Sequence, residues 1–261
     1  MQRFTTSFSP LEQFEIVPLL SFRLGMYDFS FTNSSVIILL VVFFIYFIGL
    51  CLFNSGKGFL VPNRWQVLFE GLFNFILGIV FENIGKEGVR LFPFIFTLFM
   101  FLILCNVLGL VPYSYTVTSQ FIITFVLSLI IWVGKLFIGV RKHGIKLLGL
   151  LLPEGIPLII VPFFVIVEFI SFLIPLVALG VRLFANIMAG HILLKVIVGF
   201  CWTIIIAGGI FFIAHFIPIG VLFLLLFLET AVAFIQAYIF TMLACLYTGD
   251  VLKGGHLLFF L

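Results

Sequence analysis

The two longest apolar segments, residues 163–205 and 217–248, constrain the fold of this chain more than any other feature. A helix needs about 20 apolar residues to cross a bilayer, and backbone groups inside the hydrocarbon must pair within their own segment, so both segments are expected to be helical. As one helix the first would be about 60 Å long, roughly twice the hydrocarbon thickness. It must tilt steeply or bend, and we expect a bend at Pro175.

The composition agrees with a membrane protein. Hydrophobic residues make up 64% of the chain and charged residues only 9%, whereas soluble proteins have about a quarter charged residues. A net charge of +3 without a basic stripe argues against a nucleic-acid partner. The four cysteines lie far apart in apolar runs, which gives no metal or redox spacing, and no cofactor is expected.

We therefore predict an all-α polytopic membrane protein, with about five membrane segments plus an amphipathic surface helix. A segment without a spanning run, residues 1–35, precedes a single membrane domain, residues 36–261. The predicted spans are 36–53, 91–111 and 121–140, followed by a hairpin of two long, strongly tilted helices, 163–205 and 217–248. The amphipathic helix is 62–86, whose polar stripe faces either the membrane surface or other subunits.

Loop charge predicts the topology. Arg141, Lys142 and Lys146 follow the span 121–140, so the positive-inside rule places this loop on the inner side of the membrane. Counting spans from there puts the N-terminus outside and the C-terminus inside. Residues 147–160 are broken by prolines and are expected to re-enter or lie flat rather than cross.

Arg182 lies in the middle of the first long segment, twenty residues from Pro162 and twenty from Trp202. An arginine at this depth costs about 3 to 17 kcal/mol and cannot shed its proton, so something must compensate the charge. One interpretation is a structural ion pair with Glu168 or Glu229. The other is an intramembrane charge used in moving ions.

Other polar side chains share this hairpin. On a helix, Asn186 lies one turn beyond Arg182 on the same side, and Glu168 lies on nearly this side about 21 Å behind. His191 lies about 14 Å ahead on the opposite side. If the hairpin folds at Gly208-Gly209, facing positions can be paired. The predicted pairs are Arg182 with Gln236, His191 with Glu229, and Glu168 with Asp250.

These residues resemble a known family. Gly180-Val181-Arg182-Leu183-Phe184-Ala185-Asn186, then Ala189-Gly190-His191, and later Glu229 with Gln236, are similar to subunit a of F-type ATP synthases in its mitochondrial form. Weaker matches are Ser9-Pro10-Leu11-Glu12-Gln13-Phe14, Asn106 with Gly109, Pro112-Tyr113-Ser114, and Thr116-Val117-Thr118-Ser119. The resemblance covers nearly the whole chain.

The resemblance implies a proton-translocating stator subunit that lies against a ring of c-subunits, and not an enzyme by itself. Other membrane and peripheral-stalk subunits, lipids and protons would be its partners. Its location would be the mitochondrial inner membrane, with the N-terminus towards the intermembrane space and the C-terminus towards the matrix.

The resemblance also implies roles for individual residues. Arg182 would face the c-ring carboxylates and separate two half-channels. The implied half-channel towards the intermembrane space contains His191, Glu229 and Asn106, the one towards the matrix contains Glu168 and Asp250, and the polar neighbours of the arginine are Asn186 and Gln236.

Two alternatives come from other classes of protein. A haem-binding membrane cytochrome would need paired histidines on facing helices, for which His191 and His215 are the candidates in the hairpin. A non-rotary ion-coupled transporter would be expected to show internal repeats, and none is evident in the sequence. A purely structural anchor is a further possibility.

Overall fold

The computed structural model describes residues 12–25, 27–54, 64–111, 114–144, 161–207 and 215–253. The helices that dominate these residues are α1 (Asn33–Asn54), α2 (Arg64–Asn83), α3 (Phe92–Leu110), α4 (Phe121–His143), α6 (Val161–Ala207) and α8 (Phe216–Lys253). All six are sufficiently long and apolar to cross a membrane. The prediction of an all-α polytopic membrane protein is confirmed.

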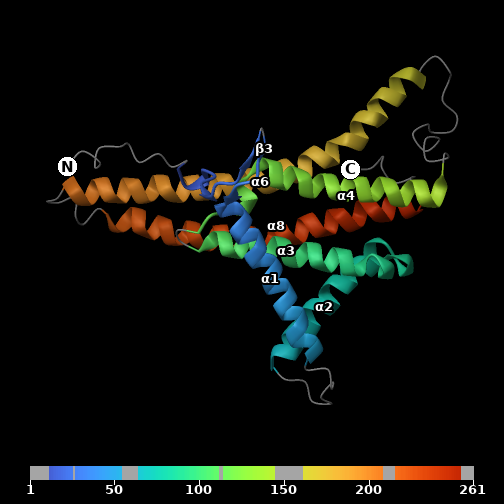
Figure 1. The fold of residues 1–261 in the computed structure, drawn as a ribbon, viewed down its shortest axis with the longest axis horizontal. Coiled ribbons are helices and arrows are strands. Elements are labelled where there is room, and N and C mark those ends of the chain that lie inside the picture. The colour runs from blue at the N-terminus through green and yellow to red at the C-terminus, as the bar shows by residue number, and fades with distance from the viewer. Residues whose placement is uncertain are drawn as a thin grey trace.

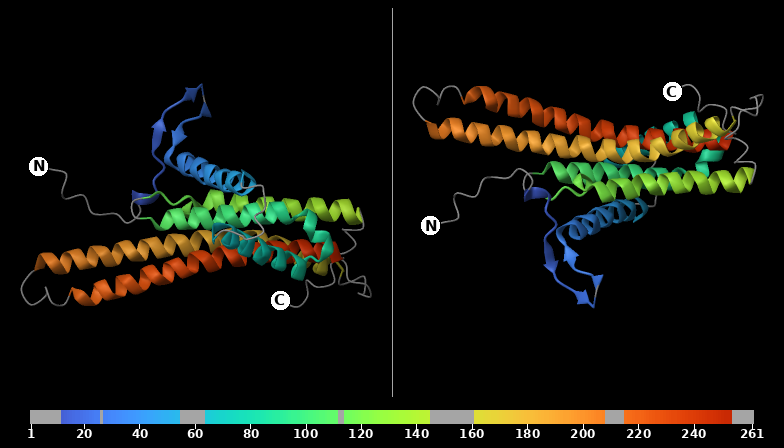
Figure 2. Two further views of the ribbon diagram at one scale, coloured as in Figure 1. Left: turned by 90° about the horizontal axis from the view of Figure 1, so that it is seen from below. Right: turned by 90° about the horizontal axis from the view of Figure 1, so that it is seen from above.

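The long helices lie in two layers, with α6 and α8 in one and α3 and α4 in the other (Figures 1 and 2). The fully buried side chains Val80, Leu102, Leu183 and Phe240 come from α2, α3, α6 and α8 and belong to one hydrophobic core. Because this core joins helices from most of the sequence, it holds residues that are far apart in the chain at fixed positions.

Helix α6 is continuous over 47 residues with Pro175 inside it. Figure 1 shows that the helix bends and that its N-terminal part turns away from α4, as the length of the segment predicted. A proline removes one backbone donor and opens nearby carbonyls. The indole Nε1–H of Trp132 on α4 donates a hydrogen bond of 3.1 Å to the carbonyl of Phe172, which stabilises this part of the bent helix.

Helix α2 buries Ile76, Ile79 and Val80, while Gln66 donates a hydrogen bond of 2.8 Å to Glu70 on the exposed side. It is inclined to the long helices rather than parallel to them (Figure 1). Its length and composition would also permit a membrane crossing. The surface location of this helix therefore stays a prediction.

Before α1, the described residues form the short helix η1 (Glu12–Phe14) and four short strands. β1 (Pro18–Leu20) pairs with β4 (Phe31–Thr32), and β2 (Arg23–Leu24) pairs with β3 (Tyr27–Asp28), both antiparallel. The sequence analysis did not predict these strands, because two or three residues are too few to show a period of two. The predicted boundary between the segment 1–35 and the membrane domain stays a prediction.

Three segments meet at one end of the molecule. In the short helix η2 (Lys86–Arg90), Glu87 forms an ion pair of 2.6 Å with Lys142 at the end of α4. The Nε2 atom of His143 lies 3.0 Å from the carbonyl oxygen of Val251 near the end of α8. These contacts place the basic last turn of α4, the start of α3 and the end of α8 together, and we name this region the basic end.

The predicted re-entrant segment and the predicted turn at Gly208-Gly209 lie outside the described residues, as does the tail that follows residue 253.

Candidate functional site

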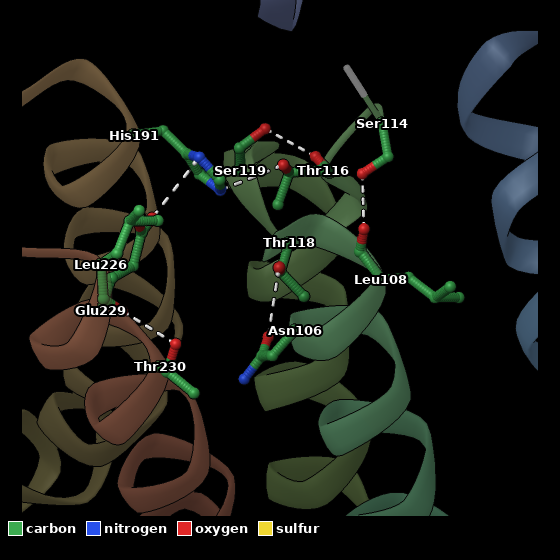
Figure 3. Close-up of polar contacts among 10 residues, drawn as sticks. All are labelled: Asn106, Leu108, Ser114, Thr116, Thr118, Ser119, His191, Leu226, Glu229 and Thr230. Atoms are coloured by element: carbon green, nitrogen blue, oxygen red, sulfur yellow. Dashed lines mark hydrogen bonds and ion pairs between the residues drawn. The ribbon is translucent and has the colours of Figure 1, made fainter. Parts of the chain in front are cut away.

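The centre of the candidate site is a contact between the two long helices. The Nδ1 atom of His191 on α6 lies 3.4 Å from the Oε1 atom of Glu229 on α8 (Figure 3). Both side chains are largely buried, with 15% and 10% of their surface exposed. The structure thus brings together the pair that the hairpin register predicted.

The His191 ring also contacts residues outside the hairpin. Its Nε2 atom lies 3.2 Å from the hydroxyl of Thr116, in the loop between α3 and α4 (Figure 3). The ring of Phe14 meets it edge-on at 6.2 Å between centroids. His191 therefore links Glu229 to a hydroxyl at the loop end of α3 and α4. The sequence analysis recorded Thr116 and Phe14 only as parts of matching motifs and missed these contacts.

Two glycines provide the space for these contacts. A Cβ atom at Gly190 would stand 3.1 Å from the Oε1 atom of Glu229, and one at Gly109 would stand 2.6 Å from the methyl group of Thr116. Both distances are shorter than ordinary van der Waals contact. The absence of a side chain at Gly190 and Gly109 thus allows Glu229 and Thr116 to approach the histidine.

Asn106 lies below this contact in a buried position on α3, with 3% of its surface exposed. Its amide donates a hydrogen bond of 3.1 Å to the carbonyl of Ala233 on α8, and its side-chain oxygen accepts one of 3.3 Å from Thr118 (Figure 3). These bonds orient the amide between α3, α8 and the loop, so Asn106 is positioned beside the predicted pair.

A small cavity of about 20 Å³ connects the polar groups further along the hairpin. Its polar lining comes from Asn106, Asn186, Glu229 and Gln236. A volume of this size is enough for about one water molecule, provided that polar partners surround it. Neither carboxylate oxygen of Glu229 accepts a hydrogen bond from the residues that the structure describes, so the carboxylate has free acceptor capacity next to this cavity.

The hydrogen bond between Asn186 and Gln236 corrects the predicted register. Gln236 accepts a 2.9 Å hydrogen bond from Asn186, one helical turn beyond Arg182, where the register had placed it beside Arg182 itself. The facing positions of α6 and α8 are therefore shifted by one helical turn from the predicted ones at this point of the hairpin.

Arg182 is exposed on α6. The exposed residues that precede it on the same helix include the apolar Ile174, Val177 and Val181. Among the side chains that the structure describes, no carboxylate lies within ion-pair distance of its guanidinium. The structural pair with Glu229 is excluded, because Glu229 contacts His191, whereas the side chain of Glu168 lies outside the description.

The residues assigned to the other half-channel are only partly described. Asp250 on α8 is half-buried and interacts electrostatically with Lys135 and Tyr247. Tyr247 also interacts electrostatically with Arg182. The predicted contact between Glu168 and Asp250 stays a prediction, because only the backbone of Glu168, on α6, is described.

The buried position of Lys135 was not predicted from the sequence. It was not singled out from the sequence, yet its side chain is buried on α4 with its Nζ atom 4.1 Å from the centroid of the Phe172 ring. Its position inside the predicted span 121–140 was the feature of the sequence that could have indicated a buried lysine.

Comparisons with known proteins agree with the motifs. A family model described as ATP synthase A chain matches residues 34–249. A protein named ATP synthase subunit a from Chondrus crispus is 45% identical over 244 residues, covering 94% of this chain and 96% of that protein. Proteins of the same name from Pylaiella littoralis (46% over 244 residues) and Marchantia polymorpha (45% over 252 residues) each cover 94% of this chain and 98% of their own length.

The matched region includes every helix from α2 to α6 in full and most of α1 and α8, so the relationship extends over the membrane domain. It supports neither a haem-binding cytochrome nor a non-rotary transporter. The resemblance seen around Arg182 is confirmed: this chain belongs to the ATP synthase A chain family.

Proposed function

We propose that this chain is the proton-conducting stator subunit of a rotary ATP synthase, in which Arg182 faces the carboxylates of a turning c-subunit ring. The observation that carries the proposal is an exposed guanidinium on an apolar, membrane-length helix without an ion-pair partner among the described side chains. A charge in that position is costly unless an anion from another chain compensates it. A membrane-embedded carboxylate on a neighbouring subunit fulfils this requirement.

The arginine would act on the passing carboxylate through its charge. Opposite charges about 4 Å apart attract by about 4 kcal/mol at an effective dielectric constant of 20, which favours the ionised carboxylate. The rotor group therefore releases its proton near Arg182. Beyond the arginine it must become neutral before it enters lipid, since an unpaired carboxylate there is costly, so it takes up a proton from the other side.

Arg182 would also keep the two proton paths apart. A guanidinium does not give up its proton and repels others, so protons cannot pass directly between the half-channels. Each proton that crosses a potential of 100 mV yields about 2.3 kcal/mol, and this free energy would bias the rotation in one direction.

The entry path in this proposal runs from the loop between α3 and α4 to the centre of the hairpin. Thr116, His191 and Glu229 form a chain of contacts, and the small cavity continues from Glu229 to Asn186 and Gln236. Histidine is suited to pass protons near neutral pH. With the loop end towards the intermembrane space, protons would enter here, with Asn106 lining the path.

The exit path would lead towards the basic end through Glu168 and Asp250. The positive-inside rule assigns this end to the matrix. The chain would carry no catalytic centre of its own and would work only with the c-ring and the other membrane and peripheral-stalk subunits, in the mitochondrial inner membrane.

The test is ATP-driven proton pumping in membranes that contain Arg182→Ala or Arg182→Lys. We expect Arg182→Ala to abolish coupled pumping, because no permanent charge remains to ionise the rotor carboxylate. Arg182→Lys retains a charge and is expected to keep a small residual activity. Arg64→Gln, at the start of α2, removes a cation far from the site and should pump normally. Normal pumping by an assembled Arg182→Ala complex would refute the proposed function.

A further inference from the structure

A large pocket at the basic end is lined by none of the described residues assigned to the proposed proton paths. It has a volume of about 970 Å³ and lies between η2 with the start of α3, the second half of α4, and the end of α8. Figure 1 shows these segments beside one another. Asp250 is not among the described residues that line it.

One continuous face of α4 forms a wall of this pocket. Its lining residues recur at the spacing of a single helical face, from Ile130 and Ile131 through Gly134 and Lys135 to Arg141 and Lys142. Residues of α8 at intervals of four, Ala244, Thr248 and Leu252, form a second wall. The pocket is thus bounded by rigid helices.

The lining is strongly basic at one end. Lys86, Arg90, Arg141 and Lys142 line it, with Glu87 as the one carboxylate among its described lining residues. Glu87 is already committed to Lys142 through the 2.6 Å ion pair. Among the side chains that the structure describes, no carboxylate lies within ion-pair distance of Lys86, Arg90 or Arg141.

Lys135 adds a fifth cation deeper in the pocket. It precedes Arg141 by six residues, which corresponds to about 9 Å along the helix. The side chain is only 3% exposed, and its Nζ atom faces the rings of Phe172 at 4.1 Å and Tyr247 at 5.5 Å. Asp250 on α8 interacts electrostatically with this ammonium group and compensates part of its charge. The positive charge of Lys86, Arg90 and Arg141 has no carboxylate at ion-pair distance among the described side chains, so the pocket as a whole points to an anionic ligand.

The rest of the lining is apolar and opens outward. Phe94, Ile130 and Phe137 line the pocket and are 45%, 44% and 67% exposed. They lie on helices of membrane length, so their exposed surface would meet lipid. A ligand of this pocket can therefore extend from the basic end along an apolar surface.

We propose that the pocket binds an anionic phospholipid, with its phosphate at the basic end and an acyl chain along Phe94, Ile130 and Phe137. Basic pockets between membrane helices on the inner side suit phospholipid headgroups, and arginines such as Arg90 and Arg141 can bind phosphate oxygens through two hydrogen bonds. A free phosphate ion would fill only the polar part and leave the apolar wall unused. The lipid fits both parts.

The experiment uses the intact ATP synthase in bilayers that contain a photoactivatable phosphatidylglycerol analogue or a phosphatidylcholine analogue with the same chains. Mass spectrometry of the labelled peptides would locate the attachment. We expect labelling within residues 91–95 and 130–138, about tenfold stronger for the anionic lipid. Arg90→Gln with Arg141→Gln should reduce it about 10- to 30-fold, since each basic residue near the surface contributes about 1 kcal/mol.

Three controls make the result specific. Arg64→Gln should leave the labelling unchanged, and Arg90→Lys with Arg141→Lys should retain most of it because the charges remain. If the double glutamine variant does not assemble, Lys135→Met alone should still lower the labelling several-fold.

The proposal would be overturned by equal labelling with both lipids, by labelling that the charge changes do not affect, or by complete competition from millimolar inorganic phosphate. Attachment of the pocket residues to a neighbouring subunit instead of lipid would also overturn it.

Discussion

At the scale of single residues, the candidate site depends on close approach. His191 can contact both Glu229 and Thr116 because the chain has glycine at the two positions where a side chain would collide with these partners. Buried polar groups need such contacts, since a polar side chain without a partner is costly in an apolar region. The glycines therefore matter for function even though they carry no chemistry.

The change Gly190→Ala tests this dependence. The new methyl group would stand 3.1 Å from the Oε1 atom of Glu229, so the carboxylate must move away from His191. We expect proton pumping to fall several-fold, with little loss of assembled complex, because an alanine in a helix is otherwise favourable by about 1 kcal/mol. Pumping in membrane vesicles and the amount of complex measure the two effects.

Gly199→Ala is the matched control, because it lies on the same helix and a Cβ atom there meets nothing within 4 Å. Normal pumping by this variant together with reduced pumping by Gly190→Ala would tie the effect to the carboxylate. Equal pumping by both variants would show that the position of Glu229 is not critical.

The ion pair of Glu87 with Lys142 is expected to make the stability of the folded state depend on pH. The hydrogen bond and the charge of Lys142 lower the pKa of Glu87 below its ordinary value of 4.5. A lowered pKa in the folded state stabilises the fold above the unfolded pKa, and this contribution is lost as the pH falls through the lower folded value. The pair is solvent-exposed, so its contribution to the stability of the fold is small.

We therefore expect Glu87→Gln to lower the unfolding temperature of the purified complex slightly at pH 7, with the difference from wild type shrinking as the pH falls below 4.5 and through the lower folded pKa of Glu87. Thermal unfolding over this pH range measures it. Glu70→Gln is the control, because Glu70 hydrogen-bonds to Gln66 rather than to a cation. A difference that persisted unchanged in acid would contradict the assigned role of the pair.

At the scale of helices, the packing of α2 against α8 depends on Gly249. A Cβ atom there would stand 2.5 Å from the carbonyl oxygen of Asn83 at the end of α2, which is backbone and cannot rotate away. We expect Gly249→Ala to destabilise the subunit by about 1 to 3 kcal/mol through overpacking. The thermal stability and yield of assembled complex would measure this loss.

Gly220→Ala, on the same helix in open space, should be tolerated. If both glycine variants of α8 were equally stable, α2 would not be held against α8 as the structure describes.

At the scale of the whole molecule, the proposal places two proton paths at opposite ends of the hairpin. His191 is linked to the loop that joins α3 and α4, whereas Asp250 is near the ends of α4 and α8. Cysteine replacements at His191 and Glu168 are therefore expected to react with membrane-impermeant thiol reagents added from opposite sides. Labelling in inverted and right-side-out vesicles measures this access.

Wild-type complex gives the background labelling from the four native cysteines, of which Cys105, Cys201 and Cys245 are buried in the described structure. Reaction of both introduced cysteines from the same side would contradict the separation of the paths.

The amino-acid sequence by itself determined the class of protein, the presence of long apolar helices and the presence of a charge in the middle of one of them. These follow from hydropathy over about 20 residues and from the cost of charge in lipid, which are local properties. It also predicted the contact of His191 with Glu229, because a hairpin of two helices makes facing positions countable.

Only the tertiary structure decided which other groups meet. Phe14 and Thr116 reach His191 from distant parts of the chain, Gln236 bonds to Asn186 one turn away from the predicted partner, and Lys135 lines a basic pocket. Such contacts depend on helix crossing angles, on the length of the hairpin turn and on glycines that admit close approach. No periodic pattern in the sequence encodes these quantities, because they arise only when the helices pack into one core.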